Sequence, residues 1–178
     1  MSTSPVDSLV SAVTALDVPC ERTTPEQFEA TLAAHVEEPA VGVGLRDQSV
    51  SLDGTAVTVD PAPAALKAAH TGVTPAAFAV ADYGSIVLPS TDDGAELVSL
   101  FVDRHVAVVD ANDVVPGMEA AFERFEEHVA DGAGAASNII ATGPSATADM
   151  GELVLGAHGP SEVHVVVVEG DAAEVEDE

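Results

Sequence analysis

The sequence predicts an α/β protein with an open, mostly parallel sheet and helices on both faces. Short β-branched and apolar runs alternate along the chain with segments of helical periodicity, the pattern of strand–helix–strand units. The run Val163–Val168 is almost entirely valine, as expected for a central strand that is buried on both faces. The 178 residues, of which 47% are hydrophobic, are enough for one domain with a sizeable core.

We expect this single domain to span residues 1–170, with two helices in residues 1–38 packed on it. Ser4 and Pro5 form a cap followed by proline at the first helical position, and apolar residues at helical spacing come next. The second helix is predicted to start at Thr24–Gln27, which has the pattern of a capping box, and to end at His35 or Val36. Residues 171–178 are expected to form an acidic, disordered tail.

The remaining elements follow from apolar runs, turn residues and periodicity. Strands are predicted at residues 41–45, 55–59, 78–81, 85–88, 105–109, 139–142 and 162–168. Helices are predicted at residues 62–69, 95–101, 118–129 and 147–155, with a small, flexible loop at residues 131–136.

The chain is strongly acidic along its whole length. Asp and Glu number 31 against five Lys and Arg, which gives a formal net charge of −26. Molar salt shortens the Debye length to roughly 3 Å and screens such self-repulsion, so we interpret the charge as an adaptation to a salt-rich cytoplasm. A localised acidic surface for a partner is the competing interpretation. Nucleic acid is excluded as a partner because clustered Lys and Arg are missing.

Other classes are also disfavoured by the sequence. No apolar run reaches the length of a membrane-spanning helix, and the first ten residues lack the positive region of a signal peptide, so we expect a cytoplasmic protein. Cys20 is the only cysteine, which excludes an intrachain disulfide and a self-contained iron–sulfur or cysteine-zinc site. We therefore expect no metal and no cofactor in this chain.

Four segments, in this order, resemble the LUD (lactate-utilisation) domain family, specifically its LutC type. They are Gly72–Ala76 with Ala81–Ser85, Val98–Leu100 with His105–Val109, Gly143–Ser145 with Thr147–Asp149, and Gly156–Pro160. The resemblance covers roughly the C-terminal three-fifths of the chain. Ala146 departs from it, because the family usually carries a basic residue there.

The resemblance implies a fold of the NagB/RpiA/CoA-transferase-like group, in which ligands sit outside the carboxyl ends of the strands. It also implies a role as a LutC-like subunit that assists the oxidation of lactate to pyruvate. Iron–sulfur clusters are then expected in partner proteins of the complex and not in this chain. A small carboxylate is the expected ligand, and the sequence is compatible with a homo-oligomer.

The first candidate site is an anion site around Gly143, Ser145 and Thr147. A helix that starts there would present unpaired N–H groups and a positive dipole end to a carboxylate or phosphate. Ser145 is equally explained as an ordinary helix cap. Gly84 and Ser85 are expected to join this site at the carboxyl end of the sheet.

His158 and Asp82 are the candidate catalytic residues. A histidine titrates near neutrality and suits the role of base for the lactate hydroxyl proton, although a structural role in the His-Gly-Pro turn is the alternative. Asp82 is a second acid candidate, and turn formation with Gly84 explains it equally well. His105 and His164 lie in apolar strands and are expected to be satisfied core or edge histidines.

Two other functions compete with the lactate-utilisation subunit. Fold-level analogy favours a stand-alone protein or transferase that binds a small anion, a sugar phosphate or an acyl-CoA. The third hypothesis is a non-catalytic assembly module. An enzyme acting alone is the less favoured hypothesis, because no catalytic constellation has a recognisable local pattern.

Overall fold

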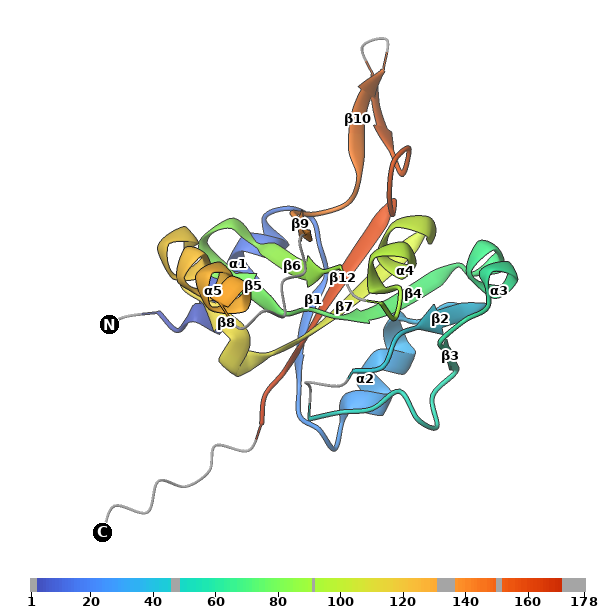
Figure 1. Cartoon of the computed structure of the whole chain (residues 1–178), viewed down its shortest axis with the longest axis horizontal. Helices are drawn as coiled ribbons and strands as arrows, with labels where there is room; N and C mark the ends of the chain where they lie inside the picture. The colour runs from blue at the N-terminus through green and yellow to red at the C-terminus, as the bar shows by residue number, and fades with distance from the viewer. Residues whose placement is uncertain (1–2, 46–48, 91, 131–136, 150–151, 171–178) are drawn as a thin grey trace.

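The computed structural model describes residues 3–45, 49–90, 92–130, 137–149 and 152–170 (Figure 1). Its centre is a six-stranded sheet in which every pair of neighbours is parallel. The spatial order is β1 (Cys20–Thr23), β12 (Glu162–Val168), β7 (Arg104–Asp110), β4 (Thr71–Pro75), β2 (Ala40–Gly42) and β3 (Val57–Val59). The predicted α/β class with a mostly parallel sheet is confirmed.

Helices cover both faces of this sheet. Successive side chains of a strand point to opposite faces, so the apolar strands present an apolar surface on each side. Phe28 and Leu32 of α2 (Phe28–His35) pack with Val166 and Val168 of β12. The intervening residues Val165 and Val167 pack with α1 (Pro5–Thr14) on the other face. That second face also carries α3 (Pro63–Ala68) and α4 (Ala95–Phe101), over the end of the sheet near β2.

A smaller mixed sheet packs on the α1 face. Its strand order is β8 (Val114–Val115), β5 (Phe78–Val80), β6 (Ser85–Pro89) and β9 (Asn138–Ala141). The short 3₁₀ helix η1 (Ala81–Tyr83) connects β5 to β6, and η2 (Ala111–Asp113) leads from β7 of the main sheet into β8. Helix α5 (Met118–Ala130) covers it, with the Phe125 ring 5.2 Å from the Phe78 ring in an edge-on contact.

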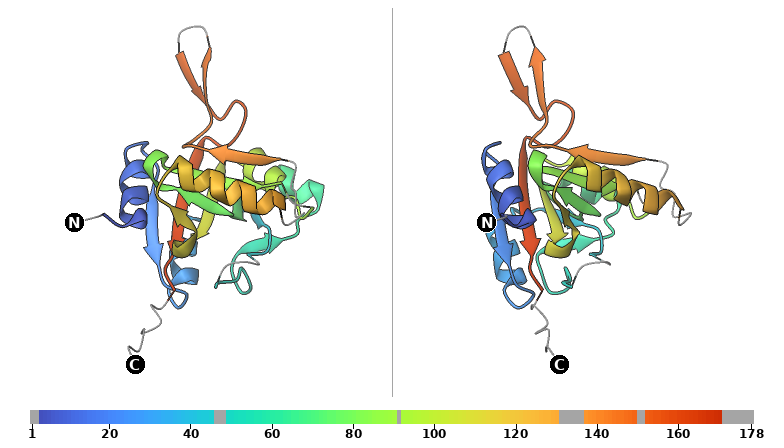
Figure 2. Two further views of the ribbon diagram at one scale, coloured as in Figure 1. Left: turned by 60° about the vertical axis from the view of Figure 1, so that its left-hand side comes forward. Right: turned by 90° about the vertical axis from the view of Figure 1, so that its left-hand side faces the viewer.

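Strands β10 (Ala146–Asp149) and β11 (Glu152–Leu155) form an antiparallel hairpin that projects away from both sheets (Figures 1 and 2). We call this hairpin the arm. The helix predicted at residues 147–155 is therefore wrong. Gly151 in the middle of the predicted helix is a poor helix former, and the short apolar run Leu153–Leu155 is equally typical of a strand.

The N-terminal predictions are confirmed in part. Helix α1 is capped as expected, with the Asp7 backbone N–H donating to Ser4 Oγ at 3.1 Å. Helix α2 begins only at Phe28, because Thr24–Gln27 form a turn in which the Gln27 N–H donates to the Thr24 carbonyl. Strands β1, β4 and β8 were not predicted. The predicted loop at residues 131–136 and tail at residues 171–178 lie outside the described residues.

Among the helices of the described ranges, none combines the length and the apolar character that a membrane crossing requires.

Candidate functional site

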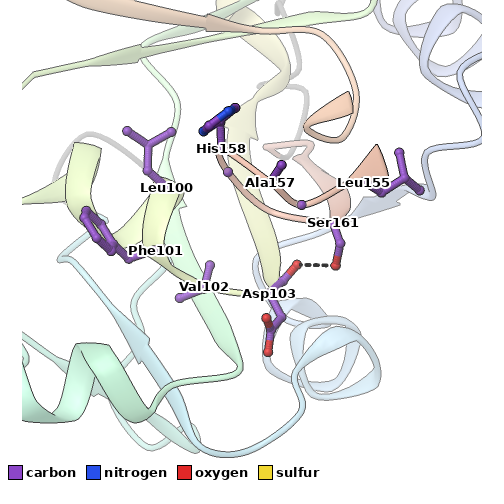
Figure 3. A pocket seen from close by; sticks show the side chains of 10 residues that line it. Leu100, Phe101, Val102, Asp103, Leu155, Ala157, His158 and Ser161 are labelled. Atoms are coloured by element: carbon purple, nitrogen blue, oxygen red, sulfur yellow. Dashed lines mark hydrogen bonds between the residues drawn. The ribbon is translucent and has the colours of Figure 1, made fainter. Parts of the chain in front are cut away.

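A groove of about 540 Å³ lies between the end of α4 and the loop that follows the arm (Figure 3). One wall is Leu100–Asp103, and the other is Leu155–Gly159 with Ser161. Asp103 directly precedes β7 and Ser161 directly precedes β12, so the groove is at the amino ends of these parallel strands. Ser161 Oγ donates to the Asp103 carbonyl at 3.2 Å and ties the two walls together.

Gly143–Ser145 were expected at the carboxyl end of the sheet, and the structure places them at the amino end. The Ser145 N–H donates to the Pro160 carbonyl at 2.8 Å, two residues before β12 begins. Because β9 belongs to the small sheet and not to the parallel one, the segment after it enters the main sheet from its amino edge.

The described residues between 147 and 155 form strands, so no helix N-terminus is present there to bind an anion. Thr147 lies in β10, opposite Val154 of β11, and the Ser145 N–H is already bonded. No helix dipole and no row of unpaired N–H groups points at a ligand from this segment. Binding by the hydroxyls of Ser145 and Thr147 remains a prediction without that support.

Ser145 and the His158 loop do lie together. A Cβ placed on Gly159 would lie 3.2 Å from Cβ of Ser145 and 3.8 Å from a methyl group of Leu100. His158 is exposed beside the groove and makes no hydrogen bond with any described residue. Its imidazole nitrogens are thus open to a ligand or to solvent.

Gly84 and Ser85 contact other parts of the fold. Gly84 has φ of 63°, and a Cβ there would lie 3.0 Å from the backbone nitrogen of Val13 in α1. Ser85 Oγ is 2.7 Å from Thr142 Oγ1, which brings β6 next to the segment that leads into the arm. Gly84 therefore serves packing against α1. Ser85 contacts Thr142, which is the residue before Gly143.

Asp82 is not among the residues that line the groove. It is exposed on η1, where its N–H donates to the Pro116 carbonyl and its carboxylate lies over Gly117. The structure therefore places Ser145 against the loop that carries His158, although Ser145 does not line the groove. Asp82 lies at a different contact, between η1 and the residues that follow β8.

Sequence reasoning missed a polar network at the amino ends of β4, β7 and β12, on the α2 face. Arg104 pairs with Glu37 at 2.9 Å and with Glu162 at 2.7 Å. His70 lies between Glu37 and Asp103, at 3.2 and 3.0 Å. The Asp103 carboxylate is thereby engaged away from the groove that its backbone lines. The partners come from segments far apart in sequence, so no local spacing indicated them.

Two further histidines extend this network. His35 Nδ1 at the end of α2 is 2.9 Å from His164 Nδ1 of β12, and His35 Nε2 is 2.7 Å from Glu21. Burial, followed by the nearby charges of His35 and Arg104, lowers the pKa of His164. The prediction that His164 is a satisfied histidine of the sheet is confirmed by this contact.

His105 is also a satisfied core histidine, as predicted. Its Nε2 is 2.8 Å from Thr74 Oγ1 on the neighbouring strand β4, and both side chains are buried. Burial lowers the pKa of His105 to about 4, so the ring is neutral near pH 7. Within the described ranges, no three His, Cys, Asp or Glu side chains are arranged to hold a metal ion.

The fold thus defines the class of protein: an α/β protein with an open parallel sheet and an added mixed sheet. The groove lies at the amino edge of the parallel sheet. A solved structure of a DUF162 family protein from Deinococcus radiodurans shares the fold, with a TM-score of 0.67. The two sequences are 20% identical over 92% of this chain and 96% of that one.

The family is given by a family model described as the LUD domain, which matches residues 27–168. This match covers most of the chain, and the chain belongs to the LUD domain family. The resemblance found in the sequence motifs is thereby confirmed.

Similar curated proteins carry the name Lactate utilization protein C. The relative from Bacillus licheniformis is 38% identical over 103 residues, which are 57% of this chain and 43% of the relative. The relative from Bacillus subtilis is 34% identical over 102 residues, 56% of this chain and 42% of the relative. The matched part is less than half the length of these relatives.

Proposed function

We propose that this chain is a LutC-like subunit of a lactate-utilisation system, which assists the oxidation of lactate to pyruvate together with iron–sulfur partner proteins. The observation that carries the proposal is the 38% identity over 103 residues to a protein named Lactate utilization protein C. Within this proposal the chain works in the cytoplasm.

The chemistry of Cys20 supports the location of the clusters in partners. Iron–sulfur clusters are held by several cysteine thiolates, and Cys20 is the only cysteine of the sequence. Burial raises the pKa of its thiol to about 11, so the thiolate is disfavoured near neutral pH. The electrons taken from lactate would therefore pass to groups held elsewhere in the complex.

The groove is the proposed place of contact with a small carboxylate. His158 offers unbonded ring nitrogens beside it and suits the role of acceptor for the lactate hydroxyl proton. The second proposed contact is Ser145, whose side chain lies against the same loop but outside the residues that line the groove. The apolar wall formed by Leu100 and Val102 would exclude water from the methyl end of the ligand.

The test is purification of the tagged full chain from its own cells, grown on lactate and kept in molar KCl. We expect co-purifying proteins with the visible absorption of iron–sulfur clusters, and lactate-dependent reduction of a dye. Cells grown on another carbon source are the control. A colourless single chain without dye reduction contradicts the proposal and favours a stand-alone anion-binding protein or transferase, to be followed by ligand screening.

A second candidate is a non-catalytic assembly module of the same system, and the exposed apolar arm favours it. The variants His158→Gln and Ser145→Ala separate the two candidates. For a ligand-binding subunit we expect lactate-dependent dye reduction by the purified complex to fall at least tenfold in His158→Gln, with partner recovery unchanged. Full activity in both variants assigns the chain to assembly alone.

A further inference from the structure

The arm has one entirely apolar face. The register pairs Ala146 with Leu155 and Ala148 with Leu153, and directly opposed residues of an antiparallel pair share a face. The opposite face carries Thr147 and Val154 and, beyond them, Glu152. A two-stranded hairpin with one apolar face and one partly polar face is suited to packing its apolar face against another apolar surface.

No part of the described chain covers this face. Leu153 is 70% exposed and Leu155 is 51% exposed, and the arm stands clear of both sheets in the views of Figures 1 and 2. An isolated two-stranded hairpin is marginally stable in water, so contact with another surface would stabilise it. Large exposed apolar patches mark interaction sites in soluble proteins.

The apolar surface continues from the arm onto the body. Leu155 lines the groove together with Leu100 and Phe101 of α4. Phe101 is 68% exposed, although aromatic side chains are usually buried in a domain of this size. The apolar face of the arm, with Leu155, and Phe101 at the end of α4 thus lie on one surface, which we call the docking surface.

The charge around the docking surface indicates the kind of partner. Residues 143–161 and 95–103 contain no lysine or arginine, and the nearest exposed acid of the arm, Glu152, lies on its opposite face. Arg104, next in the chain, is turned to the other side of the sheet, where Glu37 and Glu162 hold it. A second copy of this chain would bring another net charge of −26 and, through the same surface, no lysine or arginine to match.

We propose that the docking surface binds a different protein, whose complementary surface is apolar and bordered by lysine and arginine. The inference deepens the proposed function, on which it rests for the identity of the complex, by assigning the surface through which this chain joins it. Apolar contact supplies the affinity, and the basic border favours this partner over a second acidic copy, an effect that molar salt confines to charges within roughly 3 Å of each other.

The experiment compares matched variants of the tagged full chain, purified from cells grown on lactate. Phe101→Ser alters the docking surface, and Phe122→Ser is its control, because Phe122 is 66% exposed on α5 outside that surface. Leu153→Ser combined with Leu155→Ser tests the arm. Circular dichroism and thermal melting establish that all variants are folded.

We expect the partner recovered with the natural chain to be lost at least tenfold in the arm variant and several-fold in Phe101→Ser. Phe122→Ser should retain it fully. A photo-cross-linking amino acid at position 153 should mark one partner protein, at an apolar segment with lysine or arginine beside it. Its association rate with this chain should fall as KCl is raised from about 0.1 M to about 1 M, because the Debye length shortens from about 10 Å to about 3 Å.

Three results would overturn the inference: equal recovery of the partner in all variants, a cross-link to a second copy of this chain, or a cross-linked surface without basic residues. Dye reduction separates this outcome from the proposed function. A natural complex that does not oxidise lactate contradicts the proposed function alone. A lactate-oxidising complex that ignores the arm and Phe101 contradicts the docking surface alone.

Discussion

The parallel sheet and the arm use similar residues in opposite ways. In β7 and β12 the valines of the central pair, such as Val108 and Val166, are fully buried between α2 on one side and α1 on the other. In the arm Leu153, Val154 and Leu155 are 70%, 40% and 51% exposed. Burial within the chain therefore specifies the sheet, whereas the arm keeps its apolar surface for contacts outside the described residues.

The same substitution in the two regions should separate them most strongly. Leu32→Ala removes a buried side chain from the α2 core and should lower the free energy of unfolding by about 2–5 kcal/mol. Leu153→Ala in the arm should change it by less than about 0.5 kcal/mol. Chemical denaturation at one fixed KCl concentration measures both. A loss in Leu153→Ala as large as in Leu32→Ala would show that the arm is part of the core.

The pH dependence of stability should come from the sheet, through His105. The folded protein holds this ring neutral down to about pH 4, whereas an unfolded histidine takes up a proton near pH 6.5. The unfolded state thus binds more protons between these values, so stability is full above pH 6.5 and falls as the pH drops towards 4. The loss should be on the order of 3 kcal/mol.

His105→Gln checks this assignment by removing the titrating group. Its free energy of unfolding should run parallel to that of the natural chain above pH 7 and fall less steeply between pH 6.5 and 4. Denaturation curves across this range give the comparison. Identical slopes in the two proteins would show that other groups produce the acid sensitivity.

Two glycines with positive φ offer a finer comparison. Gly84, against α1, and Gly143, before the arm, have φ of 63° and 72°, so alanine should cost about 1–2 kcal/mol of backbone strain at each. Gly84→Ala should cost more, because its Cβ would meet the Val13 nitrogen at 3.0 Å, whereas the nearest atoms at Gly143 are 3.9 Å away. Thermal melting compares the loss of stability in the two variants. Equal losses would contradict a packing role for Gly84.

The smallest expected effect distinguishes two serines. Ser4 caps α1, and Ser4→Ala should lower the free energy of unfolding by about 1 kcal/mol. Ser145 precedes a strand and its hydroxyl caps nothing, so Ser145→Ala should change it by less than about 0.5 kcal/mol. A full cap-sized loss in Ser145→Ala would indicate a helical start at the arm, as the sequence pattern predicted.

Elements with strong local signals were predictable from the sequence. Ser4 and Pro5 define the start of α1, and the bounds of α4 and β12 are those predicted. Strand β4 was missed because Gly72 and Pro75 are poor strand formers. Its glycine serves packing instead, since a Cβ at Gly72 would lie 2.7 Å from the Val98 carbonyl oxygen of α4.

The location of the candidate site depended on tertiary structure. The sequence motifs contain both Ser145 and His158, and Ser145 does lie against the His158 loop, because backbone hydrogen bonds join it to Gly156 and Pro160. Their place at the amino edge could not be predicted, since it depends on β9 pairing with β6 in a separate sheet. The ion pairs of Arg104 depend on strand order in the same way.

The root of the arm has an evolutionary consequence. The Gly156 N–H donates to the Ser145 carbonyl at 2.9 Å, so the chain leaves and re-enters the body at one closed point. A segment inserted between such neighbouring ends is free to lengthen, shorten or change its surface residues while the body keeps its fold. We expect the sequence of the arm to diverge faster within this family than the sequence of the sheet. Partner choice would then change through the arm while the body keeps its fold.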